Sequence, residues 1–258
     1  MTAATEPPAD RPVAVVTGAS SGIGAATARQ LTEAGFHVVV GARRLDRLRE
    51  VAAPIGARAL ALDVTDPASV EAFAAEVPRC SLLVNNAGGA LGLEPIASAD
   101  DEAWRWMYEA NVLGVARMTR AALPLLVGNP GSFIINVGSI AGRVAYEGGS
   151  IYCASKAGEL QITRALRLEL WGTGVRVGTL DPGMAETEFS LVRFKGDAAR
   201  SAKVYEGTFP LTAEDVAEAV VWMASRPPHV NIDEMVIKAT DQAALHKVHR
   251  RTSQGSGK

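Results

Sequence analysis

The stretch VAVVTGASSGIG, residues 13–24, joins an apolar, β-branched run to a glycine-rich turn. The run does not alternate between apolar and polar residues, which is typical of a strand buried on both faces of a parallel sheet. Gly18, Gly22 and Gly24 then follow at a spacing that lets the backbone turn tightly and approach a pyrophosphate at a helix N-terminus. Because the turn lies between a strand and a helix, it predicts a dinucleotide-binding unit rather than a purely steric turn.

Outward from this turn, strand-like runs alternate with helix-like stretches. Further strands are expected at residues 37–43, 57–64, 81–88, 131–139, 175–183 and 234–240. Helices are expected at about 22–34, 44–52, 65–77, 101–127, 151–171 and 212–225, with Thr65 or Asp66 as a cap and Pro67 in the first turn. This alternation predicts an α/β fold, a single-domain Rossmann-type doubly wound parallel sheet of about seven strands flanked by helices.

The domain boundaries follow from composition. Residues 1–11 contain acidic residues and proline and are expected to form a disordered N-terminal tail, and the polar residues 244–258 a flexible C-terminal tail. The catalytic domain is therefore expected at 12–243. Within it, residues 184–210 have no clear periodicity and are expected to be irregular, near the carboxyl ends of the strands where ligands bind.

Composition argues against several classes of protein. The formal net charge of −2 provides no field that attracts nucleic acid or an anionic membrane. No apolar stretch approaches the roughly 20 residues needed to span a bilayer, and the N-terminus lacks the pattern of a signal peptide. Cys80 and Cys153 are the only cysteines, and the four histidines lack ligand spacing, so no metal site is expected. So few cysteines fit a cytoplasmic protein in a reducing compartment.

The end of the second expected strand indicates which dinucleotide is bound. An NAD site usually has an acidic residue there for the ribose hydroxyls, whereas this sequence has Arg43 and Arg44. Two guanidinium groups suit a 2′-phosphate, and Asp46 is expected in the next helix, pointing outward. The pattern predicts NADP as cofactor, although a solvated helix start would also explain the two arginines.

Tyr152 and Lys156 lie one helical turn apart, and therefore on the same face of the expected helix 151–171. An ammonium group beside a phenol favours the phenolate and eases proton exchange with a carbonyl or alcohol oxygen. Ser139 ends the fifth expected strand, where its hydroxyl can hold the same oxygen. The surrounding Ala, Ser and Gly residues leave room for a nicotinamide and a small-molecule substrate.

These motifs resemble those of the short-chain dehydrogenase/reductase superfamily over about residues 12–243. The resemblance rests on TGASSGIG at 17–24, NNAG at 85–88, YCASK at 152–156 and DPGMAET at 181–187, with Asn111 and Ser139. It implies a catalytic tetrad of Asn111, Ser139, Tyr152 and Lys156, in which Asn111 holds a water beside Lys156 and Lys156 also binds the nicotinamide ribose. Cofactor contacts are expected from Gly18, Ser20, Ser21, Gly22, Ile23, Gly24, Arg43, Arg44, Asp63, Val64, Asn86, Ala87, Gly88, Tyr152, Lys156, Pro182, Gly183 and Thr187.

The segments TEFSLVRFKGD, 187–197, and RPPHVNIDEMVIKATDQA, 226–243, are similar to the NADP-dependent 3-hydroxy acid dehydrogenases. That resemblance implies hydride transfer between NADP(H) and the alcohol or carbonyl of a small 3-hydroxy acid. A carboxylate substrate would need a cation, for which Arg193, Lys195 and Arg143 are candidates, although each can equally brace a loop or a subunit contact.

Other interpretations remain open from the sequence. The same tetrad would suit a reductase of bulkier ketones, aldehydes or 3-oxoacyl chains, and a non-enzymatic redox sensor would bind NADP(H) without turnover. The helices at 101–127 and 151–171 carry apolar residues beyond what one sheet face can use, and the family pairs such helices between subunits. A homotetramer or dimer is expected, with core packing as the alternative for each residue. The apolar residues concerned are Trp104, Met107, Leu160 and Trp171.

Overall fold

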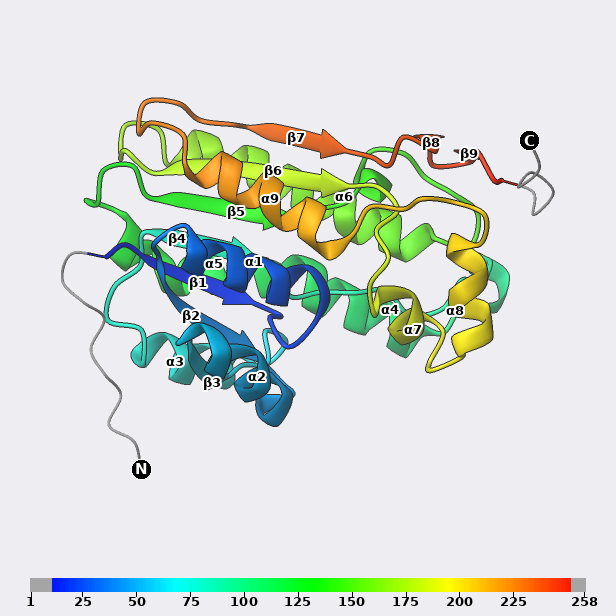
Figure 1. Ribbon diagram of the computed structural model, residues 1–258, viewed down its shortest axis with the longest axis horizontal. Coiled ribbons are helices and arrows are strands. Elements are labelled where there is room, and N and C mark those ends of the chain that lie inside the picture. Colours follow the sequence, from blue (N-terminus) through cyan, green and yellow to red (C-terminus); the bar gives the residue numbers. More distant parts are fainter. Residues whose placement is uncertain (1–10, 252–258) are drawn as a thin grey trace, which may run out of the picture.

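A central sheet of seven parallel strands organises the protein in this computed structural model, which describes residues 11–251 (Figure 1). The strands are β1 (Val13–Thr17), β2 (His37–Ala42), β3 (Arg58–Ala61), β4 (Leu82–Asn85), β5 (Phe133–Val137), β6 (Arg176–Pro182) and β7 (Glu234–Ile237). Their spatial order is β3-β2-β1-β4-β5-β6-β7, so the sheet extends from β1 in two directions. The predicted doubly wound α/β fold is confirmed.

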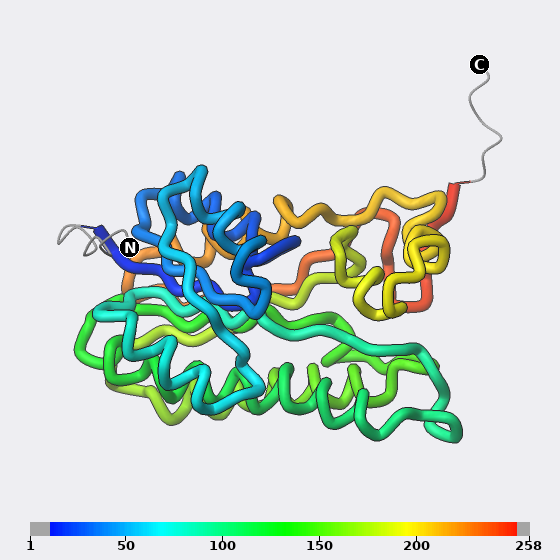
Figure 2. The backbone as a smooth tube through the Cα atoms, turned by 90° about the horizontal axis from the view of Figure 1, so that it is seen from below, coloured from blue at the N-terminus to red at the C-terminus, as the bar shows by residue number. Residues whose placement is uncertain are grey.

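Helices cover both faces of this sheet. On one face, α1 (Gly22–Glu33), α2 (Leu45–Ala52) and α9 (Ala213–Ala224) contribute to an apolar core with the strands. On the other, α3 (Pro67–Ala75), α5 (Gly114–Leu126) and α6 (Ser150–Glu169) form the second core. Figure 2 shows the two layers, with the green helices on one side of the sheet and the blue and orange helices on the other. No helix in residues 11–251 is long and apolar enough to cross a membrane.

The local sequence explains where these elements begin. All five residues of β1 are buried, as a strand covered on both faces requires, and Val13 pairs with His37 in parallel register. Asp66, rather than Thr65, caps α3, because its carboxylate accepts a hydrogen bond from the Ala68 amide at 3.0 Å. The predicted cap and the first-turn position of Pro67 are therefore confirmed.

The helix expected at 101–127 is divided. It consists of α4 (Asp101–Tyr108), a π-helical turn at Glu109–Leu113, and α5. A π-helical turn inserts one extra residue into the helix and so changes which side chains face inward. Here it places Asn111 in a fully buried position, an effect that periodicity alone does not reveal.

Three parts of the chain are more ordered than the sequence indicated. Residues 184–210, expected to be irregular, contain α7 (Phe189–Arg193) and α8 (Ala198–Tyr205). Residues 244–251, assigned to a flexible tail, instead include part of a hairpin of β8 (Gln242–Ala244) and β9 (Lys247–Val248). Arg11, assigned to the other tail, donates to the carbonyl of Gly35 at 2.9 Å. The rest of the two expected tails, 1–10 and 252–258, lies outside the described residues.

Candidate active site

A cleft of about 750 Å³ lies at the carboxyl ends of the strands. In Figure 1 the arrowheads of β1, β5 and β6 point toward the side of the molecule where α7 and α8 lie. The glycine turn after β1, the ends of the neighbouring strands, the start of α6 and helix α7 all contribute to its wall. This is the position at which doubly wound sheets bind ligands.

The glycine turn has the backbone shape that a close approach to a ligand requires. Gly18 has φ +68° and Gly22 has φ +53°, conformations that side-chain-bearing residues rarely adopt. Gly24 does not line the cleft. A Cβ there would lie 2.5 Å from Asn86 Nδ2, which donates to the Thr17 carbonyl at 2.9 Å. Gly24 is therefore needed for the contact between the turn and the end of β4.

Cationic side chains gather beside this turn. The Arg44 guanidinium donates to Ser20 Oγ at 3.1 Å and to Ser21 Oγ at 2.8 Å, and it pairs with Glu188 at 3.0 Å. Arg43 lies over the ring of Trp106, 5.6 Å from the ring centroid. The Asp46 side chain is 95% exposed, as expected, and therefore does not enter the cleft.

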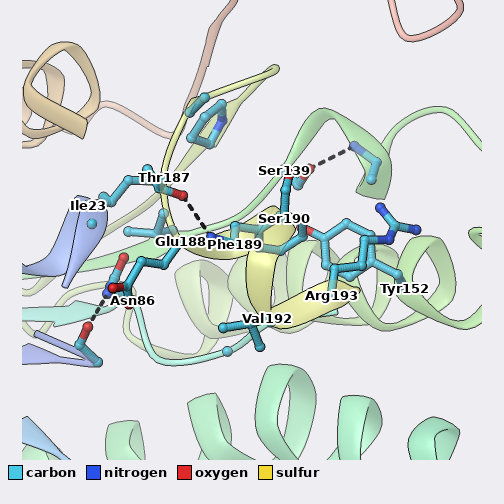
Figure 3. A pocket seen from close by; sticks show the side chains of 18 of the residues that line it. Ile23, Asn86, Ser139, Tyr152, Thr187, Glu188, Phe189, Ser190, Val192 and Arg193 are labelled. Carbon is cyan, nitrogen blue, oxygen red and sulfur yellow. Dashed lines mark hydrogen bonds between the residues drawn. The ribbon is translucent and has the colours of Figure 1, made fainter. Parts of the chain in front are cut away.

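The remaining expected cofactor residues surround the same space. Asp63 accepts hydrogen bonds from the amide and the hydroxyl of Thr65, at 3.0 and 2.7 Å, which fixes its carboxylate at the end of β3. Figure 3 shows Ile23, Asn86 and Thr187 at one end of the cleft. The other predicted residues that line it are Gly18, Ser20, Ser21, Gly22, Arg43, Arg44, Val64, Ala87, Gly88, Pro182 and Gly183.

Tyr152 and Ser139 lie at the other end of the cleft (Figure 3). Tyr152 is in the first turn of α6, with its ring 5.5 Å from that of Phe189 on α7, centroid to centroid. Ser139 follows β5, and its Oγ accepts a hydrogen bond from the Ala141 amide at 3.1 Å. That contact leaves the hydroxyl hydrogen of Ser139 available to a substrate oxygen.

Lys156 lines the cleft but is itself buried. Its Nζ donates to the Val137 carbonyl at 2.9 Å and to Glu159 Oε2 at 2.6 Å. Burial opposes the charge of the ammonium, but Glu159, with further contributions from Tyr152 and Asp181, outweighs burial, so the pKa of Lys156 lies above its ordinary value. The lysine is thus held as a cation in a fixed position.

Asn111 lies behind the cleft and does not line it. Its Oδ1 accepts from the Gly89 amide at 2.9 Å, and its Nδ2 donates to the Gly89 carbonyl at 2.9 Å and to Ser155 Oγ at 3.0 Å. Its side-chain hydrogen bonds therefore tie the loop after β4 to α6 and do not include Lys156. Gly88 packs against the side-chain amide of Asn111, because a Cβ at position 88 would lie 2.4 Å from Asn111 Oδ1.

The three candidate cations for a substrate carboxylate differ in position. Arg143 is a brace, since it pairs with Asp181 at 2.6 Å and with Glu234 at 2.7 Å. Lys195 is exposed and does not line the cleft. Arg193 does line it, with its guanidinium 5.8 Å from the centroid of the Tyr152 ring (Figure 3).

Arg193 is partly satisfied by the protein. Its Nε donates to the Gly92 carbonyl at 2.8 Å, whereas its Nη2 is buried and has no hydrogen-bond partner among residues 11–251. The guanidinium also lies 5.4 Å from the centroid of the Tyr146 ring. Burial raises the pKa of Tyr146 to about 12 even though Arg193 opposes that shift, so Tyr146 is a neutral neighbour of the cation.

Two carboxylates of the site escaped the sequence analysis. Glu188 precedes α7 and pairs with Arg44 and Arg47. Burial opposes ionisation of Glu188, but hydrogen bonds from Ser21 and the two arginines outweigh it and keep the pKa of Glu188 low. Glu159 lies three residues past Lys156, and an acidic residue inside a helix of small and apolar residues was the available signal. No group of three metal-ligating side chains occurs in the described chain.

Comparisons with known proteins agree with this geometry. The model of the short chain dehydrogenase family matches residues 12–196. The NADP-dependent 3-hydroxy acid dehydrogenase YdfG of Salmonella typhi is 44% identical over 246 residues, covering 92% of this chain and 99% of that protein. Sulfoacetaldehyde reductase 2 of Chromohalobacter salexigens is 43% identical over 240 residues, covering 90% of this chain and 95% of that protein.

A solved structure is similar along nearly the whole chain. The closed form of serine dehydrogenase complexed with NADP+ superposes with a TM-score of 0.88 at 41% identity, covering 93% of this chain and 100% of that one. The family match, the sheet order and the placement of the glycine turn and Tyr152 around one cleft all agree. The chain belongs to the short-chain dehydrogenase family.

Proposed function

We propose that this protein is an NADP-dependent oxidoreductase that transfers hydride between NADP(H) and the alcohol or carbonyl carbon of a small 3-hydroxy acid. The observation that carries the substrate class is the position of Arg193, which lines the cleft beside Tyr152 and forms no salt bridge with a carboxylate of residues 11–251. A guanidinium without a protein carboxylate can pair with an anionic group of the substrate. The similarity to the 3-hydroxy acid dehydrogenase and to serine dehydrogenase supports the same class.

NADP fits the end of the cleft near β2. Gly18 and Gly22, both at positive φ, line the cleft in the turn that leads into the N-terminus of α1, where a phosphate can bind. Arg44, with the hydroxyls of Ser20 and Ser21, can contact a 2′-phosphate, which a guanidinium binds in a bidentate manner. When bound, NADP(H) accepts or supplies the hydride.

The protein moves the proton. Tyr152 donates its phenolic proton to the substrate carbonyl oxygen during reduction and removes a proton from the alcohol during oxidation. Ser139 holds the same oxygen with its free hydroxyl hydrogen. Lys156, held as a cation, stabilises the phenolate that forms. Asn111 positions α6 against the loop after β4 and so supports Tyr152.

Assembly and location belong to the same proposal. Leu168 and Trp171, at the end of α6, are 79% and 82% exposed, and large apolar side chains exposed together are typical of a subunit contact. We propose a dimer or tetramer with this helix at an interface. Cys80 and Cys153 are both free, which suits a reducing cytoplasm.

The first experiment follows nicotinamide absorbance with candidate substrates. NADP+ reduction is measured with L-serine, L-allo-threonine, 3-hydroxyisobutyrate and 3-hydroxypropionate, and NADPH oxidation with uncharged, bulkier ketones. We expect turnover on the short acids to exceed turnover on the uncharged ketones. Activity confined to the bulky carbonyls would remove the hydroxy-acid assignment, and tight NADPH binding without any turnover would favour a redox sensor.

Two variants test whether the expected preference for short acids depends on Arg193. Arg193→Gln should raise KM for the short acids by about 10-fold or more, the value of one charge-assisted hydrogen bond, with a smaller effect on uncharged ketones. Lys195→Gln is the matched control, because it removes a positive charge two residues away that lies outside the cleft. Equal loss on charged and uncharged substrates would refute Arg193 as the anion partner.

A further inference from the structure

Glu159 lies one helical turn beyond Lys156, on the face of α6 that is turned toward the sheet. Its Oε2 is 2.6 Å from Lys156 Nζ, which also donates to the carbonyl of Val137 at 2.9 Å. Glu159 is 1% exposed, and its Oε1 has no hydrogen-bond partner in residues 11–251. A carboxylate in this position is poorly solvated, so its ion pair with the lysine is the main compensation for its burial.

The other carboxylate near the Lys156–Glu159 pair has a cationic partner of its own. Asp181 on β6 is the further carboxylate that acts on both members, but Arg143 pairs with it at 2.6 Å and the Thr179 hydroxyl donates to it at 2.6 Å. Tyr152, on α6 itself, also acts on Lys156. Within the described chain, no second carboxylate forms an ion pair with Lys156. Removing Glu159 would therefore leave a buried ammonium without a counter-ion.

Burial gives this carboxylate an unusual titration. It raises the pKa of Glu159 to about 7, although the ammonium of Lys156 opposes the shift. The carboxylate in turn keeps Lys156 charged in spite of burial. Each group therefore depends on the other, and the two titrate as a coupled pair.

We propose that Glu159 is a positioning residue for Lys156. Glu159 fixes Lys156 Nζ against Val137 and holds the ammonium protonated, and it thereby sets the alkaline limit of proton transfer by Tyr152. This inference rests on the proposed catalytic roles of Tyr152 and Lys156. Glu159 itself does not line the cleft, so it acts through the lysine and not on the substrate.

The first test measures thermal unfolding and needs no substrate. In Glu159→Gln, the buried Lys156 loses its counter-ion, and its pKa falls below the value of about 10.4 in the unfolded chain. The unfolded chain then binds more protons than the folded one, so stability of the variant rises with pH. We expect the Tm deficit of Glu159→Gln to narrow between about pH 8 and about pH 10.

Glu169→Gln is the matched control, since it removes the same charge from an exposed position on the same helix. Its Tm relative to wild type should not change with pH over that range. A Tm deficit of Glu159→Gln that is likewise independent of pH would mean that the carboxylate acts only through its shape, and would overturn the proposal.

The second test follows the rate of NADPH-dependent carbonyl reduction against pH. Reduction requires a charged Lys156 beside the phenol of Tyr152, so its rate falls when the lysine loses its proton. Without the negative charge of Glu159 this proton is lost more easily. The alkaline limb of kcat should move down by about one pH unit or more in Glu159→Gln and stay in place in Glu169→Gln.

The two tests separate the possible failures. If wild type reduces no carbonyl, the proposed function fails, while the Tm measurement still decides whether Glu159 holds the charge of Lys156. If Glu159→Gln does not fold, Glu159→Asp keeps the charge but lengthens the pair, and should move the alkaline limb downward by a smaller amount. An alkaline limb of Glu159→Asp at the wild-type pH would then overturn the proposal.

Discussion

Tyr152 has neighbours from two segments of the chain that are distant in sequence. Its ring lies beside Phe189 and near the guanidinium of Arg193, both on α7, while Lys156 lies on its own helix. The position of the phenol thus depends on α7 as well as on α6. A substitution that keeps the ring and removes only the hydroxyl separates the proposed proton-transfer role of Tyr152 from its packing role.

Tyr152→Phe makes that separation. We expect kcat to fall by about 10²–10⁴-fold in both directions, because no positioned acid or base replaces the phenol. The Kd for NADPH, measured from nicotinamide fluorescence, should stay near the wild-type value because the ring remains. Tyr108→Phe, at an exposed position on α4, controls for the loss of a tyrosine hydroxyl. Turnover of Tyr152→Phe close to wild type would refute the assigned acid and base.

At the scale of single residues, the sequence predicted which chemical groups line the site better than it predicted which side chains pair with them. Gly18, Arg44 and Tyr152 were all expected in the cleft, and all three line it. The pairs Lys156–Glu159 and Arg44–Glu188 were not expected, because a carboxylate has no pattern that distinguishes a buried pair from a solvated one. Only the fold brings Glu188 to Arg44 across 144 positions of sequence.

Among the elements, buried strands were predicted well and the short helix α7 poorly. β1 and β5 are apolar except for Thr17 and Asn136, so their burial on both faces is evident from composition. α7 has only five residues and is held by tertiary contacts, for which no periodic signal exists. The hairpin of β8 and β9 was missed because its strands have only three and two residues and lead into a polar terminus.

That hairpin fastens the segment around α8. The Arg251 guanidinium makes two hydrogen bonds to Asp241, at 2.6 and 2.9 Å, and Asp241 also accepts from the Phe209 amide at 2.7 Å. Arg250 donates to the carbonyl of Val204 at 3.1 Å. The Phe209 amide, with the Arg251 side chain, holds the pKa of Asp241 below its ordinary value although burial opposes this shift. The end of the described chain therefore braces one wall of the cleft.

Arg251→Ala should loosen this wall without unfolding the sheet. We expect a several-fold higher KM for substrate and faster limited proteolysis between residues 195 and 210, with little change in Tm. The Arg251 guanidinium stacks on the ring of Phe209, 3.9 Å from its centroid. Arg226→Ala is a suitable control, because Arg226 likewise stacks on the ring of Trp222, on α9. Unchanged proteolysis and unchanged KM would show that α8 holds its place without Arg251.

The molecule as a whole presents an apolar surface at the end of α6. Full burial of a side chain such as Leu168 or Trp171 contributes on the order of 1.5–3 kcal/mol, so both together matter to an interface. Leu168→Arg with Trp171→Arg should lower the mass measured by light scattering after gel filtration. Val127→Arg, at an exposed apolar position after α5, should not. A monomeric wild type, or an unchanged mass in the double variant, would contradict the proposed interface.

The strand order has a consequence for how the chain is made. As residues leave the ribosome, β2 and β3 add on one side of β1, and β4 to β7 then add in turn on the other. Each new strand meets an open edge, and none has to separate strands that are already paired. The glycine turn and the arginines after β2 are complete before β5 and α6 are synthesised. A nascent chain can therefore form the glycine-turn end of the cleft before Tyr152 is synthesised, and the cleft is complete only when its second half docks.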